Sequence, residues 1–153
     1  MNFPEFPLPL ADAKRFPKAW ILATAERFIP QLQNQSKSKY SQFFLNGYFT
    51  KNGRSALARI IQSIGLKEGE TILLPEYFCP AMVEPFYNSG IKVKFYSLHG
   101  NLAVNKASFE SLVDENVKAC LFVSYFGISN DMKSAFSLAQ EFKLLAIEDC
   151  APT

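Results

Sequence analysis

The chain has 153 residues, of which 48% are hydrophobic and 20% charged, with a formal net charge of +2. This composition is typical of one folded domain and excludes a disordered chain, and the near-neutral charge with scattered lysines excludes a nucleic-acid or anionic-membrane surface. No apolar stretch reaches membrane-spanning length, and the first ten residues lack the basic and apolar regions of a signal peptide. Three widely spaced cysteines predict free thiols, no structural zinc and a reducing, cytoplasmic location.

The N-terminal part, residues 1–47, has a different character from the rest of the chain. It opens with a Pro- and Phe-rich stretch that we expect to be extended as far as residue 17. The spacing of apolar residues predicts a helix over 19–32, and an aromatic run predicts a short strand over 43–50. We therefore expect an extended and helical N-terminal segment, followed by a separate domain over residues 48–153.

From residue 50 onward, strand and helix patterns alternate. Apolar runs predict strands at 70–74, 91–97, 119–124 and 144–147, and amphipathic patterns predict helices at 55–64, 80–87, 108–113 and 131–142. Such alternation is typical of right-handed βαβ units. The predicted fold class is α/β, a three-layer α/β/α arrangement around a mostly parallel sheet.

Two adjacent carboxylates, Glu148 and Asp149, follow the last predicted strand. Ligands of parallel α/β sheets bind at the carboxyl ends of the strands, so both lie where a cofactor is expected. A carboxylate there can hold a protonated ring nitrogen, as in pyridoxal phosphate enzymes. The alternative is that Asp149 caps the following turn and that Glu148 is the partner of a salt bridge.

A second candidate site begins the helix over 55–64. Gly53 would let the backbone approach a ligand, Ser55 would cap the helix, and the N–H groups at a helix start attract anions. The alternative is a plain helix cap without a ligand. Arg54 opposes the helix dipole at this position, and such a local conflict favours a functional role.

Other polar and aromatic residues follow the strands at the same expected edge. Tyr77 and Phe78 could stack on a planar ring or could cover the core. Asp131 is expected to cap the helix that it precedes. The single histidine, His99, lies in a polar turn, where an exposed structural residue is expected rather than a catalytic base.

The order of these motifs resembles the DegT/StrS family of fold-type-I, pyridoxal-phosphate-dependent aminotransferases, many of which act on nucleotide-linked keto-sugars. The segments that carry the resemblance are Gly53–Leu57, Ile72–Pro80, Val123–Gly127 with Asn130–Met132, and Ala146–Ala151. The resemblance covers roughly two thirds of the chain, from about Tyr48 to the last residue. It implies part of the large domain of such an enzyme, with pyridoxal 5'-phosphate as cofactor, a keto-sugar and an amino-acid donor as substrates, and a homodimer.

The resemblance also assigns residues to the cofactor. It implies that Gly53, Arg54 and Ser55 form the phosphate-binding turn, that Asp149 pairs with the pyridine nitrogen, and that Ala151 lies beneath the ring. The family often has Thr at the position of Arg54, which removes a hydroxyl ligand of the phosphate.

Two further departures concern the ring of the cofactor. The family often has Trp or Phe where this chain has Cys79, so stacking on the ring would pass to Phe78. It usually has Gln at the position of Pro152, which removes an amide expected near the phenolic oxygen of the cofactor.

In this family the Schiff-base lysine follows the acidic residue, and no lysine follows Lys143 here. We therefore expect an N-terminal fragment without a catalytic residue, inactive in transamination alone and marginally stable because strand edges are left unpaired. The alternatives are a non-catalytic binding or interaction module on the same half-domain, and an unrelated nucleotide binder. The latter lacks both glycine-rich phosphate-binding signatures.

Overall fold

A five-stranded sheet in the order β1-β5-β4-β2-β3 organises the protein, with every pair of neighbouring strands parallel. The structure, a computed structural model, describes residues 19–21, 50–127 and 131–150. The strands are β1 (Ala19–Ile21), β2 (Thr71–Pro75), β3 (Lys92–Tyr96), β4 (Val117–Val123) and β5 (Leu145–Asp149). The helices are α3 (Gly53–Ile64), α4 (Glu84–Asn88), α5 (Lys106–Leu112) and α6 (Met132–Glu141), with single 3-10 turns η3 (Pro80–Met82) and η4 (Tyr125–Gly127).

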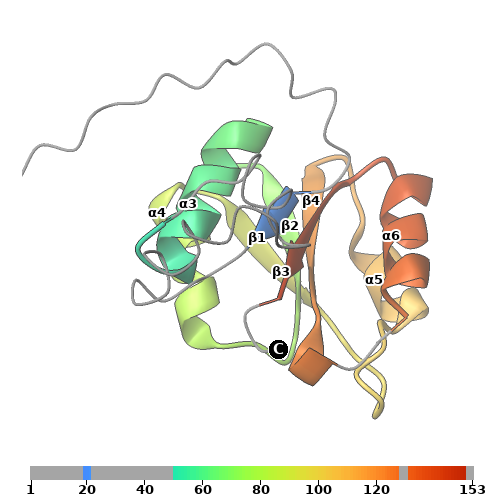
Figure 1. Ribbon diagram of the computed structural model, residues 1–153. Helices are drawn as coiled ribbons and strands as arrows, with labels where there is room; N and C mark the ends of the chain where they lie inside the picture. Colours follow the sequence, from blue (N-terminus) through green and yellow to red (C-terminus); the bar gives the residue numbers. More distant parts are fainter. Residues whose placement is uncertain (1–18, 22–49, 128–130, 151–153) are drawn as a thin grey trace, which may run out of the picture.

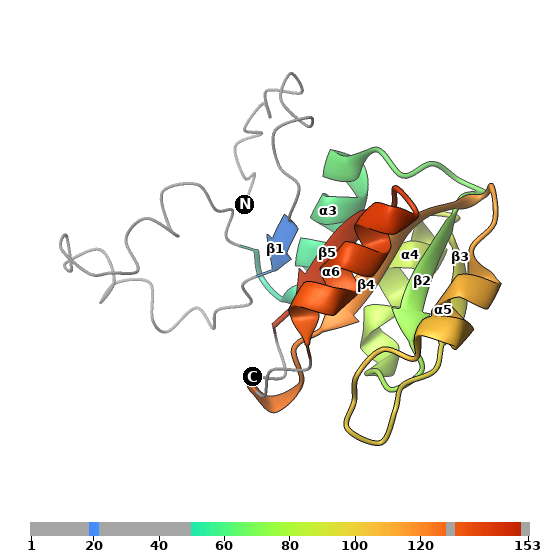
Figure 2. The same ribbon diagram turned by 90° about the vertical axis from the view of Figure 1, so that its right-hand side faces the viewer.

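Helices cover both faces of the sheet, as Figures 1 and 2 show. On one face, α3 and α4 pack through Leu57 and Phe86 onto the sheet residue Ile72. On the other face, α5 and α6 pack through Phe109 and Leu138. The predicted three-layer α/β/α class is confirmed. Within the described residues, no helix is long and apolar enough to cross a membrane.

The central strands are apolar on both sides because both of their faces are covered. All five residues of β2 are buried, and in β4 only Lys118 is exposed. The β2–β4 register shifts at this point, with Thr71 opposite Val117 and Ile72 opposite Ala119. Lys118 is thus the extra residue of a bulge, which turns its charge to solvent without breaking the apolar pattern.

The helix α3 begins two residues earlier than predicted, and its cap is Asn52. The Asn52 Oδ1 accepts hydrogen bonds from the Ser55 N–H at 2.9 Å and from the Ser55 hydroxyl at 3.1 Å. The prediction that Ser55 caps the helix is therefore wrong, because the helix begins at Gly53 and Ser55 is its third residue, with Asn52 as the cap. The helix ends as predicted at Gly65, whose φ of 72° is a left-handed conformation that favours glycine.

Two other predicted elements are corrected. The helix expected over 19–32 is wrong at Ala19–Ile21, which pairs in parallel with β5. Tertiary pairing along the edge of β5 overrides the helical spacing there, and it also leaves that edge paired over Ile147–Asp149. The helix expected over 80–87 is divided into η3 and α4, because Pro85 has no N–H with which to continue a helix from the preceding turn.

His99 is exposed in its turn, as predicted. The expected extended segment up to residue 17 and the rest of the predicted helix lie outside the described residues, as does nearly all of the strand expected over 43–50. Because the helices run antiparallel to the strands, the starts of α3, α4 and α6 lie at the carboxyl edge of the sheet.

Candidate functional site

Asp149 is the last residue of β5, at the carboxyl edge of the sheet. It lies opposite Val123 of β4 and Ile21 of β1. Its exposed fraction is 6%, and that of Glu148 is 7%. Since consecutive strand residues point to opposite faces and Ile147 packs in the layer of α3 and α4, Asp149 faces this layer, whereas Glu148 faces the layer of α6.

Glu148 is held by Ser124, the residue that follows β4. The Ser124 hydroxyl donates to Glu148 Oε1 at 2.7 Å, and the Ser124 N–H donates to the main-chain oxygen of Asp149 at 2.9 Å. Among the described residues Glu148 forms no ion pair, so the hypothesis of a salt bridge is replaced by a hydrogen bond. Burial and then the charge of Glu148 raise the pKa of the neighbouring Cys150 thiol.

Tyr125 joins the end of β4 to the loop after β2. Its hydroxyl donates to the main-chain oxygen of Tyr77, and the two ring centroids are 5.5 Å apart. Burial first, and then electrostatic interaction with Tyr77 and Asp149, raises the pKa of the Tyr125 phenol, which keeps it a neutral donor. Reasoning from the sequence did not assign this role; an aromatic residue two positions after the last residue of a buried strand was the available signal.

The loop after β2 divides its side chains between core and solvent. Phe78 is half-buried and stacks on Phe95 with a centroid distance of 4.9 Å and an interplanar angle of 8°. Tyr77 is 57% exposed, and Cys79 is an exposed free thiol. The expectation that this loop covers the core is therefore confirmed for Phe78, which packs against the core cluster, and wrong for Tyr77.

The backbone N–H groups at the start of α3 are placed to bind an anion. Gly53 and Arg54 are the first two helical residues, whose N–H groups have no acceptor within the helix. A Cβ added to Gly53 would meet no heavy atom within 4 Å, so the approach to this turn is open. The Arg54 side chain points elsewhere, because its Nη1 contacts Glu84 Oε2 at 2.8 Å. The hydroxyl of Ser55 is bonded to Asn52.

These two features share one edge and one face of the sheet. Ala56 and Leu57 of α3 pack in the same apolar cluster as Ile147, two residues before Asp149. A helix start that attracts an anion and a buried carboxylate that attracts a cation therefore fit a ligand with a phosphate and a basic ring nitrogen. Pyridoxal phosphate has both groups. Ala151 and Pro152 lie outside the described residues.

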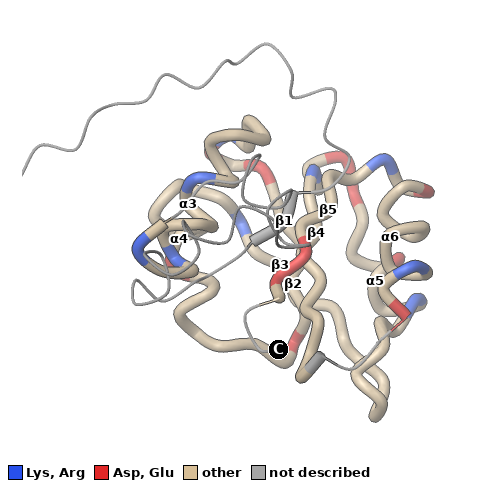
Figure 3. Tube along the Cα trace, in the orientation of Figure 1, with Lys and Arg blue, Asp and Glu red and all other residues tan. Residues whose placement is uncertain are grey.

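Among the residues that the structure describes, basic side chains do not gather on one face of the protein (Figure 3). Figure 3 shows the basic residues of the described chain distributed over both helical layers.

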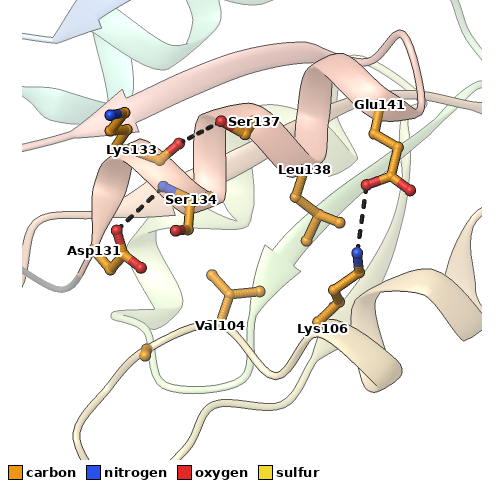
Figure 4. A pocket seen from close by; sticks show the side chains of 10 residues that line it. Val104, Lys106, Asp131, Lys133, Ser134, Ser137, Leu138 and Glu141 are labelled. Carbon is orange, nitrogen blue, oxygen red and sulfur yellow. Dashed lines mark hydrogen bonds and ion pairs between the residues drawn. The ribbon is translucent and has the colours of Figure 1, made fainter.

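A hollow of about 490 Å³ lies between α6 and the segment before α5. Figure 4 shows Val104 and Leu138 pointing toward one another in it, with Lys106 and Glu141 at one end. The Lys106 Nζ and Glu141 Oε2 atoms form an ion pair of 3.4 Å. Asp131 caps α6 at its other end through the Ser134 N–H, as predicted.

Comparison with known proteins shows the family to which the chain belongs. Residues 40–153 match the DegT/DnrJ/EryC1/StrS aminotransferase family. GDP-perosamine synthase of Vibrio cholerae is 28% identical over 101 residues, which are 65% of this chain and 28% of that protein. GDP-perosamine synthase of Escherichia coli O157:H7 is 27% identical over 127 residues, 76% of this chain and 35% of that protein. The chain thus spans about a third or less of the relatives that it matches.

Solved structures show the same fold. The DesV structure from S. venezuelae has a TM-score of 0.60 at 22% identity, covering 65% of this chain and 27% of that one. NtdA of Bacillus subtilis, solved with the cofactor PMP, has a TM-score of 0.59 at 22% identity, covering 63% of this chain and 22% of that one. The family match over most of the chain confirms the resemblance seen in the sequence: the chain belongs to the DegT/DnrJ/EryC1/StrS aminotransferase family.

Proposed function

We propose that the chain is the N-terminal part of the cofactor-binding domain of a pyridoxal-phosphate-dependent sugar aminotransferase. The observation that carries the proposal is the position of Asp149, buried at the carboxyl edge of the sheet on the face where α3 begins. An acidic residue in that place matches the pyridine-nitrogen partner of the family. We propose that the domain begins near residue 48, after a separate N-terminal segment.

The residues have distinct roles in this proposal. The Asp149 carboxylate holds a proton on the ring nitrogen, and the N–H groups of Gly53 and Arg54 hold the phosphate, with the Ser55 hydroxyl completing the turn after a rotation away from Asn52. When bound, pyridoxal phosphate supplies an electron sink that makes amino transfer possible. Phe78, Cys79 and Ala151 line the ring, a role that asks Phe78 to expose the ring face opposite Phe95; these last assignments rest on the resemblance alone.

Substrates and assembly are proposed for the complete protein. The relatives are named as GDP-perosamine synthases and as a 3-aminotransferase of a UDP-linked keto-sugar. We propose a nucleotide-linked keto-sugar as amino acceptor, an amino acid as donor, and a cytoplasmic homodimer. Since the chain spans about a third or less of its relatives, we do not expect transamination from these 153 residues by themselves.

The alternative of a non-catalytic interaction module is less well supported. Such a module would need the fold but not the acid at the end of β5 or an open helix start. The described part of the chain has both features. Their joint presence favours a cofactor site.

Binding of pyridoxamine 5'-phosphate tests the proposal on the chain as it exists. This form of the cofactor has an amine in place of the aldehyde, so it cannot form imines with surface lysines. Its binding therefore measures only the non-covalent affinity of the site. We expect saturable binding, seen as a change in ligand fluorescence, and about tenfold weaker binding by Asp149→Asn, which retains the size of the side chain but not its charge.

Asp114→Asn is the matched control, because it removes one carboxylate from an exposed site paired with Lys94. It should bind the ligand as the wild type does. Absence of saturable binding by the folded wild-type chain, or equal binding by Asp149→Asn, would contradict the proposed function.

A further inference from the structure

Glu148 needs an explanation of its own. Two consecutive carboxylates are buried at the end of β5, with exposed fractions of 7% and 6%. Burying a carboxylate is unfavourable unless hydrogen bonds compensate the lost hydration. Only Asp149 faces the layer of α3 and α4, so Glu148 cannot contact a ligand on that face directly. A buried acid that the cofactor does not use therefore has another role.

The contacts of Ser124 indicate what that role is. Its hydroxyl bonds Glu148 Oε1 at 2.7 Å, a length typical of a charge-assisted hydrogen bond. Its N–H bonds the main-chain oxygen of Asp149 at 2.9 Å. One residue thus fixes the last two residues of β5 onto the end of β4, through its backbone on one and its side chain on the other. A backbone ladder alone would provide only the first of these contacts.

The neighbouring thiol strengthens this arrangement. Cys150, the first residue after β5, interacts with both Ser124 and Glu148. Burial, and then the charge of Glu148, raise the pKa of this thiol, so it stays neutral beside the carboxylate and adds no like charge. The chain therefore leaves β5 beside Ser124, Glu148 and a thiol that stays neutral. Asp149 lies between Glu148 and Cys150, both of which interact with Ser124.

We propose that Ser124 and Glu148 form a positioning pair that fixes the Asp149 carboxylate for its contact with the cofactor ring nitrogen. A site residue must be held within about 0.5 Å of its productive position. Asp149 is the last residue of β5, so the strand pairing that restrains its backbone ends there. The pair restrains Asp149 from the opposite face. Neither residue touches the cofactor. The inference rests on the proposed function, because it concerns the same acid.

The test measures the pKa of the ring nitrogen in bound pyridoxamine 5'-phosphate, by ¹⁵N NMR of the labelled ligand over a pH series. In the wild type, Asp149 raises this pKa above that of the free ligand. In Ser124→Ala we expect the pKa to fall by about one unit and the affinity to fall about tenfold. Ser124→Thr, which retains a hydroxyl, should restore both values. A purely stabilising role would lower the melting temperature and leave the pKa of the bound ligand unchanged.

Glu148→Gln provides a second variant that retains the size of the side chain but weakens the hydrogen bond from Ser124, because the acceptor becomes a neutral amide oxygen. It should lower the ring-nitrogen pKa in the same direction, and the double variant should add little to either single change, because the two residues act as one unit. Ser137→Ala is the control, since the Ser137 hydroxyl donates to the Lys133 carbonyl within α6.

The outcomes separate the two proposals. If the wild type binds the ligand and the folded variants keep the wild-type pKa, the positioning pair is refuted and the proposed function stands. If the folded wild type does not bind the ligand, both are refuted.

Discussion

Replacing Asn52 by Asp separates the stability of α3 from the binding of a phosphate at its start. Asn52 accepts from the Ser55 N–H at 2.9 Å, and an Asp at the same position caps a helix equally well. Its charge also interacts favourably with the helix dipole, which is worth about 0.3–1 kcal/mol. We therefore expect the free energy of unfolding to stay constant or to rise slightly.

Phosphate binding should change in the opposite direction. A phosphate held by the N–H groups of Gly53 and Arg54 would lie about 5 Å from the carboxylate of an Asp at position 52, given ordinary hydrogen-bond lengths. Coulomb's law with two charges on the phosphate gives about 1.7 kcal/mol of repulsion in water, which salt screening reduces to about 1 kcal/mol. The expected result is about fivefold to tenfold weaker binding of pyridoxamine 5'-phosphate.

The assay titrates the chain with pyridoxamine 5'-phosphate and, in parallel, with pyridoxamine, which lacks the phosphate. Only the first ligand should lose affinity. The matched control is Asn105→Asp, which adds the same charge at the cap of α5, where Asn105 accepts from the Ser108 N–H at 3.2 Å. Equal affinities of Asn52→Asp and Asn105→Asp for the phosphorylated ligand would refute the assignment of the phosphate to the start of α3.

Two further predictions concern the scaffold. Phe109→Ala should lower the free energy of unfolding by about 3–5 kcal/mol in a urea titration, because this side chain is 0% exposed and packs on the rings of Tyr96 and Phe122; a loss below about 1 kcal/mol would contradict the described core. A hydrogen bond from Lys94 lowers the pKa of Asp114 below its ordinary 3.8. The stabilisation that ionised Asp114 gives to the folded state is therefore present at neutral pH and is lost as the pH falls through the folded-state pKa. The urea midpoint of Asp114→Asn should accordingly lie below that of the wild type near neutral pH and converge with it once the pH has fallen below the folded-state pKa of Asp114; a constant difference over this range would contradict that ion pair.

The layers of the fold could be predicted from the sequence because the buried strands have simple patterns. The apolar run of β4 and the alternation of strands with helices determine a parallel sheet covered on both faces. Asp149 could also be placed at the carboxyl edge, since it follows directly from the position of its strand. Periodicity is a sufficient signal wherever burial is the dominant constraint.

Features that depend on pairing between distant residues could not be predicted. The strand β1 pairs with β5 across more than 120 positions of sequence, and nothing in the three residues Ala19–Ile21 indicates this partner. The Arg54–Glu84 pair likewise joins two helix starts that are 30 positions apart. The cap at Asn52 could have been predicted, because Asn is a good capping residue. The sequence did not decide between Asn52 and Ser55, since Ser is also a preferred capping residue.

The most direct test of the central claim, that Asp149 is the partner of the cofactor ring nitrogen, is the pKa of that nitrogen in pyridoxamine 5'-phosphate bound to the chain. We predict that binding to the wild type raises this pKa above the value of the free ligand, and that Asp149→Asn removes the increase while the melting temperature shows the variant to be folded. The same pKa in the wild type, in Asp149→Asn and in the free ligand would contradict the claim.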